Sequence, residues 1–330
     1  MNYKESKLIL DEVKKAKRIL LNCHKGPDPD SIGSSLGLFA VLKGLGKQVE
    51  IICPSNEIPK EASFLENFGE IKYPIDFSTF DFSKFDLFIT LDSSSWEMVT
   101  GVKGFKPPKG LLTVVIDHHK TNARYGKINL IGDRITSTGE ILYQIFKDWG
   151  IEIGENVATP LLTGMIGDTG AFRYPGTGAK TLRAASELMD LGADKDKIVF
   201  QIYHSVDLSF LRFWKEVLQR LKVDKKYHFA WASIPYEKYT ELGNLMQGKE
   251  SSASNFSQIV KGTDFGIVMV EQEKGKLSLS LRSRTGFDTS KIALELGGGG
   301  HVYASGAKVE GLPYKEAVRK VLEVARRYAK

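Results

Sequence analysis

The chain has 330 residues, which at about 150 residues per domain predicts two domains. Charged residues make up 26% and hydrophobic residues 42%, values that exclude a disordered, collagen-like or coiled-coil protein. Lys and Arg number 46 against 40 Asp and Glu, a net charge of +6. This excess indicates an anionic partner but leaves open nucleic acid, a membrane surface or a phosphorylated metabolite.

The cysteines and the first residues indicate the cellular setting. Only Cys23 and Cys53 are present, far apart, so neither a disulfide-rich scaffold nor a cysteine zinc site is expected. The first twenty residues are charged throughout, unlike a signal peptide, and no apolar run is long enough to span a membrane. A cytoplasmic protein without a membrane partner is therefore expected.

In the first half of the chain, short apolar runs alternate with segments of helical length. Helices are predicted over residues 6–16, 31–45, 137–149 and 158–166. Strands are predicted over residues 18–23, 48–53, 85–91 and 111–116. Because such βαβ units build a parallel sheet with helices on both faces, this half is expected to be an α/β domain.

The pattern changes after about residue 180. Helices are predicted over residues 179–191, 209–221 and 314–328, with a polar connector between the first two. Strands are predicted over residues 228–234, 265–271 and 276–282, the last two joined as a hairpin. We therefore expect a main domain at 1–195, a helical linker at 196–222 and a smaller α+β domain at 223–330.

Charge is divided unevenly between the two parts. Residues 212–330 contain 21 Lys and Arg against 13 Asp and Glu, whereas residues 1–211 contain 25 against 27. The basic excess is thus entirely C-terminal, which favours the second domain as the one that holds an anion.

Aspartate and histidine residues gather after three of the predicted strands. They are His24, Asp28 and Asp30 after the first strand, Asp92 after the third, and Asp117, His118 and His119 after the fourth. A further aspartate, Asp168, ends a predicted helix. Because ligands of an open parallel sheet bind beyond the carboxyl ends of its strands, these side chains are expected to meet at one edge.

Each of these residues alone has an ordinary structural explanation, since an aspartate after a strand is commonly a helix N-cap or a turn residue. Several carboxylates at one edge repel one another, however, unless a cation is present. Mixed imidazole and carboxylate ligands favour Mn²⁺ over Ca²⁺ or a structural Zn²⁺. The number of ligands exceeds the need of one ion, so two ions that share a bridging carboxylate are predicted, an arrangement suited to phosphoryl transfer.

Four segments resemble the four motifs of the DHH phosphoesterase superfamily. They are HKGPDPDSIGS (24–34), LDSSS (91–95), IDHHKT (116–121) and MIGDTGAF (165–172). Two later segments, LSLRSR (279–284) and GGGGHVYASG (297–306), resemble the DHHA1 domain that accompanies it. The resemblance spans nearly the whole chain. It is greatest to the compact members that act as nano-RNA oligoribonucleases, adenosine 3′,5′-bisphosphate phosphatases or dinucleotide phosphodiesterases.

The resemblance implies a role for each clustered residue. Two metal ions would be held by His24, Asp28, Asp30, Asp92, His118 and Asp168. Asp92 would bridge the ions, with His24 and Asp28 on one side. Asp117 would orient a ligating imidazole, and His119 would contact the substrate or donate a proton near the scissile phosphate. Water would attack phosphorus in line, and a ribose oxygen would leave.

In the second domain the resemblance implies a substrate-binding surface, formed by Arg282, Arg284, Gly298, Gly299, Gly300 and His301. Arg282 can pair bidentately with a phosphate. Arg284, two residues along the predicted strand, would face the same side, although an exposed strand residue is an equal alternative. Consecutive glycines let a backbone approach a ligand closely, but by themselves they also describe a flexible loop.

Two positions depart from the family pattern. Met98 stands near where an Arg is common, and Ser305 stands where Ala is common. Neither is a proposed metal ligand, so the departures bear on substrate preference rather than on metal binding.

The expected activity is two-metal hydrolysis of short oligoribonucleotides to mononucleotides, with adenosine 3′,5′-bisphosphate as a further substrate. Cleavage of linear or cyclic dinucleotides is an alternative for the same site. A non-catalytic RNA-binding protein is the alternative from another class. Inorganic pyrophosphatase is ranked low because pyrophosphate needs no glycine-rich domain, and long single-stranded DNA is disfavoured because no further domain for it is evident. A homodimer is left open.

Overall fold

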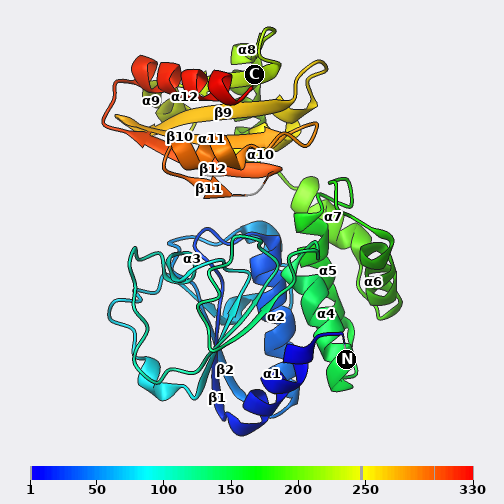
Figure 1. Cartoon of the computed structure of the whole chain (residues 1–330). Helices are drawn as coiled ribbons and strands as arrows, with labels where there is room; N and C mark the ends of the chain where they lie inside the picture. Colours follow the sequence, from blue (N-terminus) through cyan, green and yellow to red (C-terminus); the bar gives the residue numbers. More distant parts are fainter. Residues whose placement is uncertain (1, 246–247, 301, 330) are drawn as a thin grey trace. The chain divides into compact units, whose positions relative to one another are not determined.

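The computed structural model describes residues 2–245, 248–300 and 302–329. The chain divides into two compact units, the first ending at Ser205 and the second beginning at Val206 (Figure 1). Each unit has a six-stranded sheet and hydrophobic clusters of its own. The expected mixed α/β architecture is confirmed.

The sheet of the first unit is entirely parallel, in the order β3-β2-β1-β4-β5-β6. The strands are β1 (Arg18–Asn22), β2 (Gln48–Ile52), β3 (Ile71–Lys72), β4 (Leu87–Leu91), β5 (Thr113–Asp117) and β6 (Ile128–Ile131). β1, β2, β4 and β5 are the four predicted strands. The order reverses between β1 and β4, and open α/β sheets bind their ligands beyond the strand ends at such a point.

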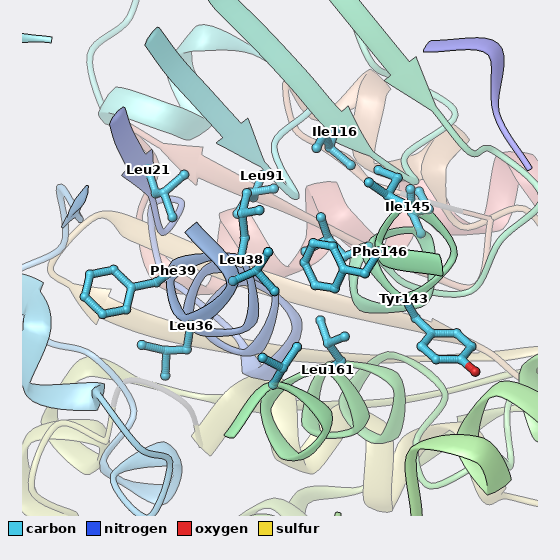
Figure 2. Close-up of a cluster of buried hydrophobic side chains, with 14 of the residues drawn as sticks. Leu21, Leu36, Leu38, Phe39, Leu91, Ile116, Tyr143, Ile145, Phe146 and Leu161 are labelled. Atoms are coloured by element: carbon cyan, nitrogen blue, oxygen red, sulfur yellow. The ribbon is translucent and has the colours of Figure 1, made fainter. Parts of the chain in front are cut away.

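The first unit also contains several helices. They are α1 (Lys4–Lys15), α2 (Pro29–Gly44), α3 (Trp96–Thr100), α4 (Thr138–Trp149), α5 (Glu155–Asp168), α6 (Ala179–Asp190) and α7 (Lys195–Tyr203). Figure 2 shows side chains of α2, α4 and α5 interdigitating with strand residues such as Leu91 and Ile116. This cluster fixes α2 and α4 against one face of the sheet and α5 against these two helices, so that the ends of all three are held in place.

The opposite face of the sheet carries a second, aromatic cluster. Leu20 and Phe88 point to this side, whereas their neighbours Leu21 and Ile89 point to the helical side, because side chains alternate along a strand. The covering residues come from the loop between β3 and β4 and from the short α3, including Phe82, whose ring centroid lies 6.0 Å from that of Phe88.

The segment after residue 191, expected to be a polar connector, contains α7. This helix lies almost entirely within the expected helical linker at 196–222, and it is amphipathic: Ile198 is fully buried, and Ile202, one turn later, packs partly buried against the same core. Its exposed residues gave the segment its polar composition.

The second unit has a mixed sheet in the order β11-β12-β10-β9-β8-β7, in which only β8 and β9 pair in parallel. The strands are β7 (Lys222–Asp224), β8 (Phe229–Ile234), β9 (Phe265–Glu273), β10 (Lys276–Ser283), β11 (Gly299–Gly300) and β12 (Ala304–Glu310). The predicted hairpin of β9 and β10 is confirmed. β10 ends at Ser283, however, so Arg284 lies beyond the strand, contrary to expectation.

Helices cover both faces of this sheet. They are α8 (Leu208–Arg220), α9 (Tyr236–Glu241), α10 (Gly248–Asn255), α11 (Ser290–Glu295) and α12 (Tyr314–Tyr328). Residues of α11 and α12 pack in one cluster, and residues of α8, α9 and α10 pack in another. In the described part of the chain, none of the helices has the length and apolar character needed to cross a membrane.

Candidate metal centre

The predicted ligands come together where the sheet order reverses. His24 follows β1, Asp92 follows β4, and His118 follows β5. The N-terminus of α2 brings Asp28 and Asp30, and the C-terminus of α5 brings Asp168. Three groups of three residues each have ligand atoms within 4.8 Å of one another: His24, Asp28 and Asp92; Asp30, His118 and Asp168; and Asp92, His118 and His119.

Asp92 lies at the centre of the arrangement. Its Oδ2 is 3.4 Å from Nε2 of His24, and its Oδ1 is 3.4 Å from Nε2 of His118. The two oxygens of one carboxylate thus face two histidines from different strands. The backbone of Asp92 is left-handed, with φ of 51°, a conformation that aspartate tolerates better than most residues. This geometry is what a bridging carboxylate requires.

The first group contains His24 and Asp28 beside Asp92. Nδ1 of His24 lies 3.1 Å from the carbonyl oxygen of Lys25, which favours a proton on that nitrogen and leaves a lone pair on Nε2. Oδ1 of Asp28 is 3.7 Å from this Nε2. The same oxygen accepts hydrogen bonds from the backbone N–H groups of Asp30 and Ser31, so Asp28 is also the N-cap of α2.

The second group contains Asp30, His118 and Asp168. Nε2 of His118 lies 3.0 Å from Oδ2 of Asp168. Asp30 is fully buried and accepts backbone N–H bonds from Thr138, at 2.6 Å, and Gly139, at 2.9 Å. These bonds fix the carboxylate of Asp30 at the N-terminus of α4. Ligand atoms of Asp30, His118 and Asp168 also lie within 4.8 Å of one another.

Asp117 holds the neighbouring imidazole. Its Oδ1 lies 2.6 Å from Nδ1 of His119, and its Oδ2 accepts a hydrogen bond from the side chain of Asn122 at 2.6 Å. Its contact with His118 is to the backbone N–H. The side chain of Asp117 therefore fixes the ring of His119.

The electrostatics of the cluster favour a bound cation. Burial raises the pKa of Asp30 well above its usual range, and the carboxylates of Asp92 and Asp168 raise it further. Burial also raises the pKa of Asp168 to about 6, against the effect of its hydrogen bond with His118. Burial opposes ionisation of Asp92 as well, but His118 and His24 hold its pKa well below the usual range.

The pKa values of the two histidines also indicate that the site favours positive charge. Burial lowers the pKa of His24 and of His118, but the adjacent carboxylates outweigh this and raise both well above the usual value. The carboxylates thus attract protons onto the imidazoles. Divalent cations would replace those protons, because metal binding to such ligands releases them. The donor set, the buried carboxylates and the paired oxygens of Asp92 together fit a pair of divalent ions.

Three contributors were missed at the sequence level. Thr138 donates its hydroxyl to Oδ1 of Asp92 at 3.2 Å. The side chains of Asn122 and Tyr125 donate to the carbonyl oxygen of Ser93 at 3.0 Å, which fixes the turn after Asp92. Asn122 and Tyr125 follow His119 closely in the sequence, so polar residues after that motif were the available signal.

The residues expected to bind substrate in the second unit lie around β12. Arg282 pairs with Ala304, and Gly300 pairs with Ser305, so β10 and β11 flank the same end of β12. Nε of Arg282 donates to the hydroxyl of Ser254 at 2.9 Å. Arg284 is exposed and donates to the carbonyl oxygen of Thr263 at 3.2 Å. His301 lies outside the described residues.

The glycine-rich segment is not a free loop, because part of it pairs with β12 as a strand. Gly299 and Gly300 form β11 against β12. A Cβ atom at Gly298 would lie 2.1 Å from the carbonyl oxygen of Gly306, whereas one at Gly299 would meet nothing within 4 Å. The hydroxyl of Ser305, the unexpected residue here, donates to Thr289 at 2.8 Å, which satisfies it inside the fold.

Comparison with known proteins gives two family matches. The pattern of the DHH family, N-terminal domain, matches residues 18–165, and that of the DHHA1 domain matches residues 250–330. The DHH match includes five of the six proposed metal ligands, His24, Asp28, Asp30, Asp92 and His118, and ends three residues before Asp168.

Individual proteins match along nearly the whole chain. The bifunctional oligoribonuclease and PAP phosphatase NrnA of Thermus thermophilus is 31% identical over 98% of this chain and 94% of its own. The cyclic-di-AMP phosphodiesterase PdeA of Listeria monocytogenes is 22% identical over 98% of this chain but 50% of its own. An exopolyphosphatase-related protein from Bacteroides fragilis has a similar structure, with a TM-score of 0.89, 26% identity and coverage of 98% and 96%.

Proposed function

Because the chain belongs to the DHH family of phosphoesterases and carries a DHHA1 domain, we propose that it hydrolyses short oligoribonucleotides to mononucleotides and removes the 3′-phosphate of adenosine 3′,5′-bisphosphate. Membership of the family makes it a hydrolase. The substrates are proposed from the printed activity of the Thermus thermophilus relative. The observation that carries the proposal is the position of Asp92, whose two oxygens each face a histidine of a different ligand group.

The candidate metal ligands would form two sets, one for each of two ions. His24 and Asp28 would hold one ion, and a second set would hold the other: Asp30, His118 and Asp168. Asp92 would contribute an oxygen to each. Two divalent ions, with Mn²⁺ the best match to this donor set, would neutralise the carboxylates and the phosphate and would make water at the site a stronger nucleophile.

His119 is proposed to protonate the leaving group. Because its Nδ1 is directed to Asp117, the ring would use Nε2 to give a proton to the departing ribose oxygen. Burial lowers the pKa of His119, but Asp117 and Asp92 outweigh it and raise that pKa above its usual value. The new P–O bond forms to a water oxygen, which releases a proton to solvent; the bond to the ribose oxygen breaks, and that oxygen receives the proton of His119.

The second unit is proposed to hold the rest of the substrate. Arg282, at the end of β10, offers a guanidinium for a phosphate, and β11, on the other side of β12, offers backbone N–H groups. A dinucleotide, linear or cyclic, is the second candidate substrate, supported by the likeness to the cyclic-di-AMP phosphodiesterase PdeA. The same hydrolytic residues would serve either substrate.

A substrate panel with the full chain in Mn²⁺ tests this proposal. Di- to pentaribonucleotides, pApA, cyclic di-AMP and adenosine 3′,5′-bisphosphate are incubated separately, and the products are separated by chromatography. We expect the oligoribonucleotides to be cleaved fastest. Faster turnover of cyclic di-AMP would favour the second candidate, and binding of RNA without turnover would favour a non-catalytic role.

Asp92→Asn is the matching variant, because it keeps the shape of the side chain and removes its charge. We expect hydrolysis to fall by more than about 100-fold and the number of bound Mn²⁺ ions per chain, measured by elemental analysis, to fall from two. Asp190→Asn, at the end of α6 and outside all three ligand groups, is the control and should change neither quantity. Full activity in Asp92→Asn would overturn the mechanism.

A further inference from the structure

The second unit contains a cavity of about 320 Å³ at the β7 edge of its sheet. It is lined by Gln219, Arg220, Lys222, Trp231, Ser233, Tyr314, Lys315 and Val318. The glycine-rich β11 forms the opposite edge of the same sheet, so the cavity shares no residue with the surface proposed above to bind substrate. All the metal-ligand candidates belong to the first unit.

The cavity combines positive charge with an aromatic ring. Lys222 and Trp231 lie directly opposite each other in the antiparallel pair of β7 and β8, so their side chains share one face. Nζ of Lys222 lies 5.1 Å from the centre of the Trp231 ring. The π face attracts the ammonium group but leaves its charge uncompensated, whereas a carboxylate would neutralise it.

No acidic side chain lines this cavity, and within the described residues neither Lys222 nor Lys315 has a carboxylate within ion-pair distance. The acidic residues of α8 and β7 are already paired with arginines: Glu216 lies 2.5 Å from Arg220, and Asp224 lies 2.9 Å from Arg326. Two lysines at the cavity therefore retain charge that an anion could neutralise.

A depression in the first unit provides a contrast. It is larger, about 440 Å³, and also contains two lysines. There, however, Lys72 pairs with Glu50 at 2.6 Å, and Lys84 pairs with Asp81 at 3.6 Å. That depression has no comparable uncompensated charge, so it carries no similar inference.

We propose that the cavity at the β7 edge is a second nucleotide-binding site, which takes one phosphorylated nucleotide, either free or as a unit of an RNA chain. The base would stack on Trp231, and the phosphate would draw Lys222 from the ring and pair with it and with Lys315. The hydroxyl of Tyr314, which donates to Ser233 at 2.8 Å, fixes the polar wall of the cavity. The volume is that of a small ligand site, which suits one nucleotide rather than a longer segment.

Fluorine NMR of the full chain labelled with 5-fluorotryptophan tests the proposal. The chain has four tryptophans, and Trp231→Phe assigns the resonance of interest. Mg²⁺ replaces Mn²⁺ to avoid paramagnetic broadening. AMP, adenosine, inorganic phosphate and a hydrolysis-resistant phosphorothioate RNA 12-mer are titrated separately. We expect AMP to shift the Trp231 resonance saturably, with adenosine and phosphate at least tenfold weaker.

Exposed lysines provide matched variants. The double variant Lys222→Ala/Lys315→Ala should weaken the AMP response of Trp231 at least tenfold, whereas Lys320→Ala, on α12 but outside the cavity, should not. The double variant should still hydrolyse a diribonucleotide at the wild-type rate.

Each other result has a defined meaning. A response to RNA but not to AMP would support a nucleotide unit within a chain. Equal responses to phosphate and AMP would show a bare phosphate site and overturn the assignment. A Trp231 resonance unmoved by millimolar AMP or RNA, or unaffected by the lysine substitutions, would also overturn it.

Discussion

Asp117 and His119 touch each other within one short segment, but we propose different roles for them in hydrolysis. The carboxylate of Asp117 holds Nδ1 of His119 at 2.6 Å and also binds Asn122, so its place is fixed from two sides. In the proposed mechanism Asp117 positions the ring, and His119 gives the proton to the leaving group. The two roles can be tested with substrates whose leaving groups differ in their need for a proton.

We expect His119→Ala to lower kcat/KM for a diribonucleotide by about 10²–10⁴-fold, the usual contribution of a general acid. The loss should be far smaller for a p-nitrophenyl phosphodiester, because p-nitrophenolate leaves without a proton. Steady-state kinetics on both substrates measures the difference. His204→Ala, exposed at the end of α7, is the control.

Asp117→Asn should lose activity in the same selective way but to a smaller extent, because the ring of His119 remains present. Equal losses on the two substrates would contradict proton donation and would instead assign His119 to binding the phosphate or a metal ion, a role that its place in the third ligand group allows.

At the level of elements, the contact of α2 with α5 is the packing that supports the ligands. A Cβ atom at Gly33 would lie 2.2 Å from the carbonyl oxygen of Pro160, so the helices approach at a distance that only glycine permits. We expect Gly33→Ala to destabilise the first unit by about 2–3 kcal/mol, measured by denaturant unfolding. Because Asp28 and Asp30 lie at the N-terminus of α2, Mn²⁺ affinity should fall as well.

Gly44→Ala is the matched control on the same helix. A Cβ atom there would meet nothing within 4 Å, and alanine favours a helix over glycine by up to about 1 kcal/mol. We expect this variant to be as stable as the parent chain or slightly more so. Similar losses in the two variants would show that the effect comes from helix propensity and not from the crossing with α5.

Adjacent glycines of the second unit offer a parallel test. Gly298→Ala would place a Cβ atom 2.1 Å from the carbonyl oxygen of Gly306 and separate β11 from β12. We expect faster hydrogen exchange of the β12 amides in this variant, measured by mass spectrometry. A Cβ atom at Gly299 would meet nothing within 4 Å, so Gly299→Ala should leave the β12 amides protected from exchange. Unchanged exchange in Gly298→Ala would mean that the pairing of β11 is not maintained in solution.

Patterns of residues predicted the central elements well, because buried parallel strands are continuous apolar runs. β1, β2, β4 and β5 are such runs, and each predicted metal ligand could be placed because it followed a strand or ended a helix. By contrast, β3 has two residues and β11 has two glycines, too few to show any period. These strands exist because neighbouring strands supply their hydrogen-bond partners.

The finer parts of the site depend on folding and not on local sequence. Thr138 is 46 residues from Asp92, and only the packing of α4 brings its hydroxyl to the carboxylate. The separation of Arg282 from Arg284 was also unpredictable, because the strand could have continued; its end at Ser283 turns the two arginines to different partners.

At the level of the whole molecule, the two units should respond differently to metal removal, since every candidate ligand belongs to the first. The three ligand groups include four carboxylates, those of Asp28, Asp30, Asp92 and Asp168. An ion that binds only the folded unit stabilises it in proportion to the logarithm of its concentration over its dissociation constant, by about 2.7 kcal/mol at a hundredfold excess. Removing Mn²⁺ should therefore weaken the first unit selectively.

Hydrogen exchange of the full chain, in excess Mn²⁺ and in EDTA, measures this selectivity. Amides of β4 and β5 that exchange only on unfolding of their unit should exchange roughly 100-fold more slowly with Mn²⁺, the factor that corresponds to 2.7 kcal/mol. Amides of β9 and β10 in the second unit should not change. In Asp92→Asn the slowing in β4 should be greatly reduced, which ties it to the bridging carboxylate and not to Mn²⁺ on the surface. Equal slowing in both units would instead mean that the ions stabilise the chain as one cooperative structure.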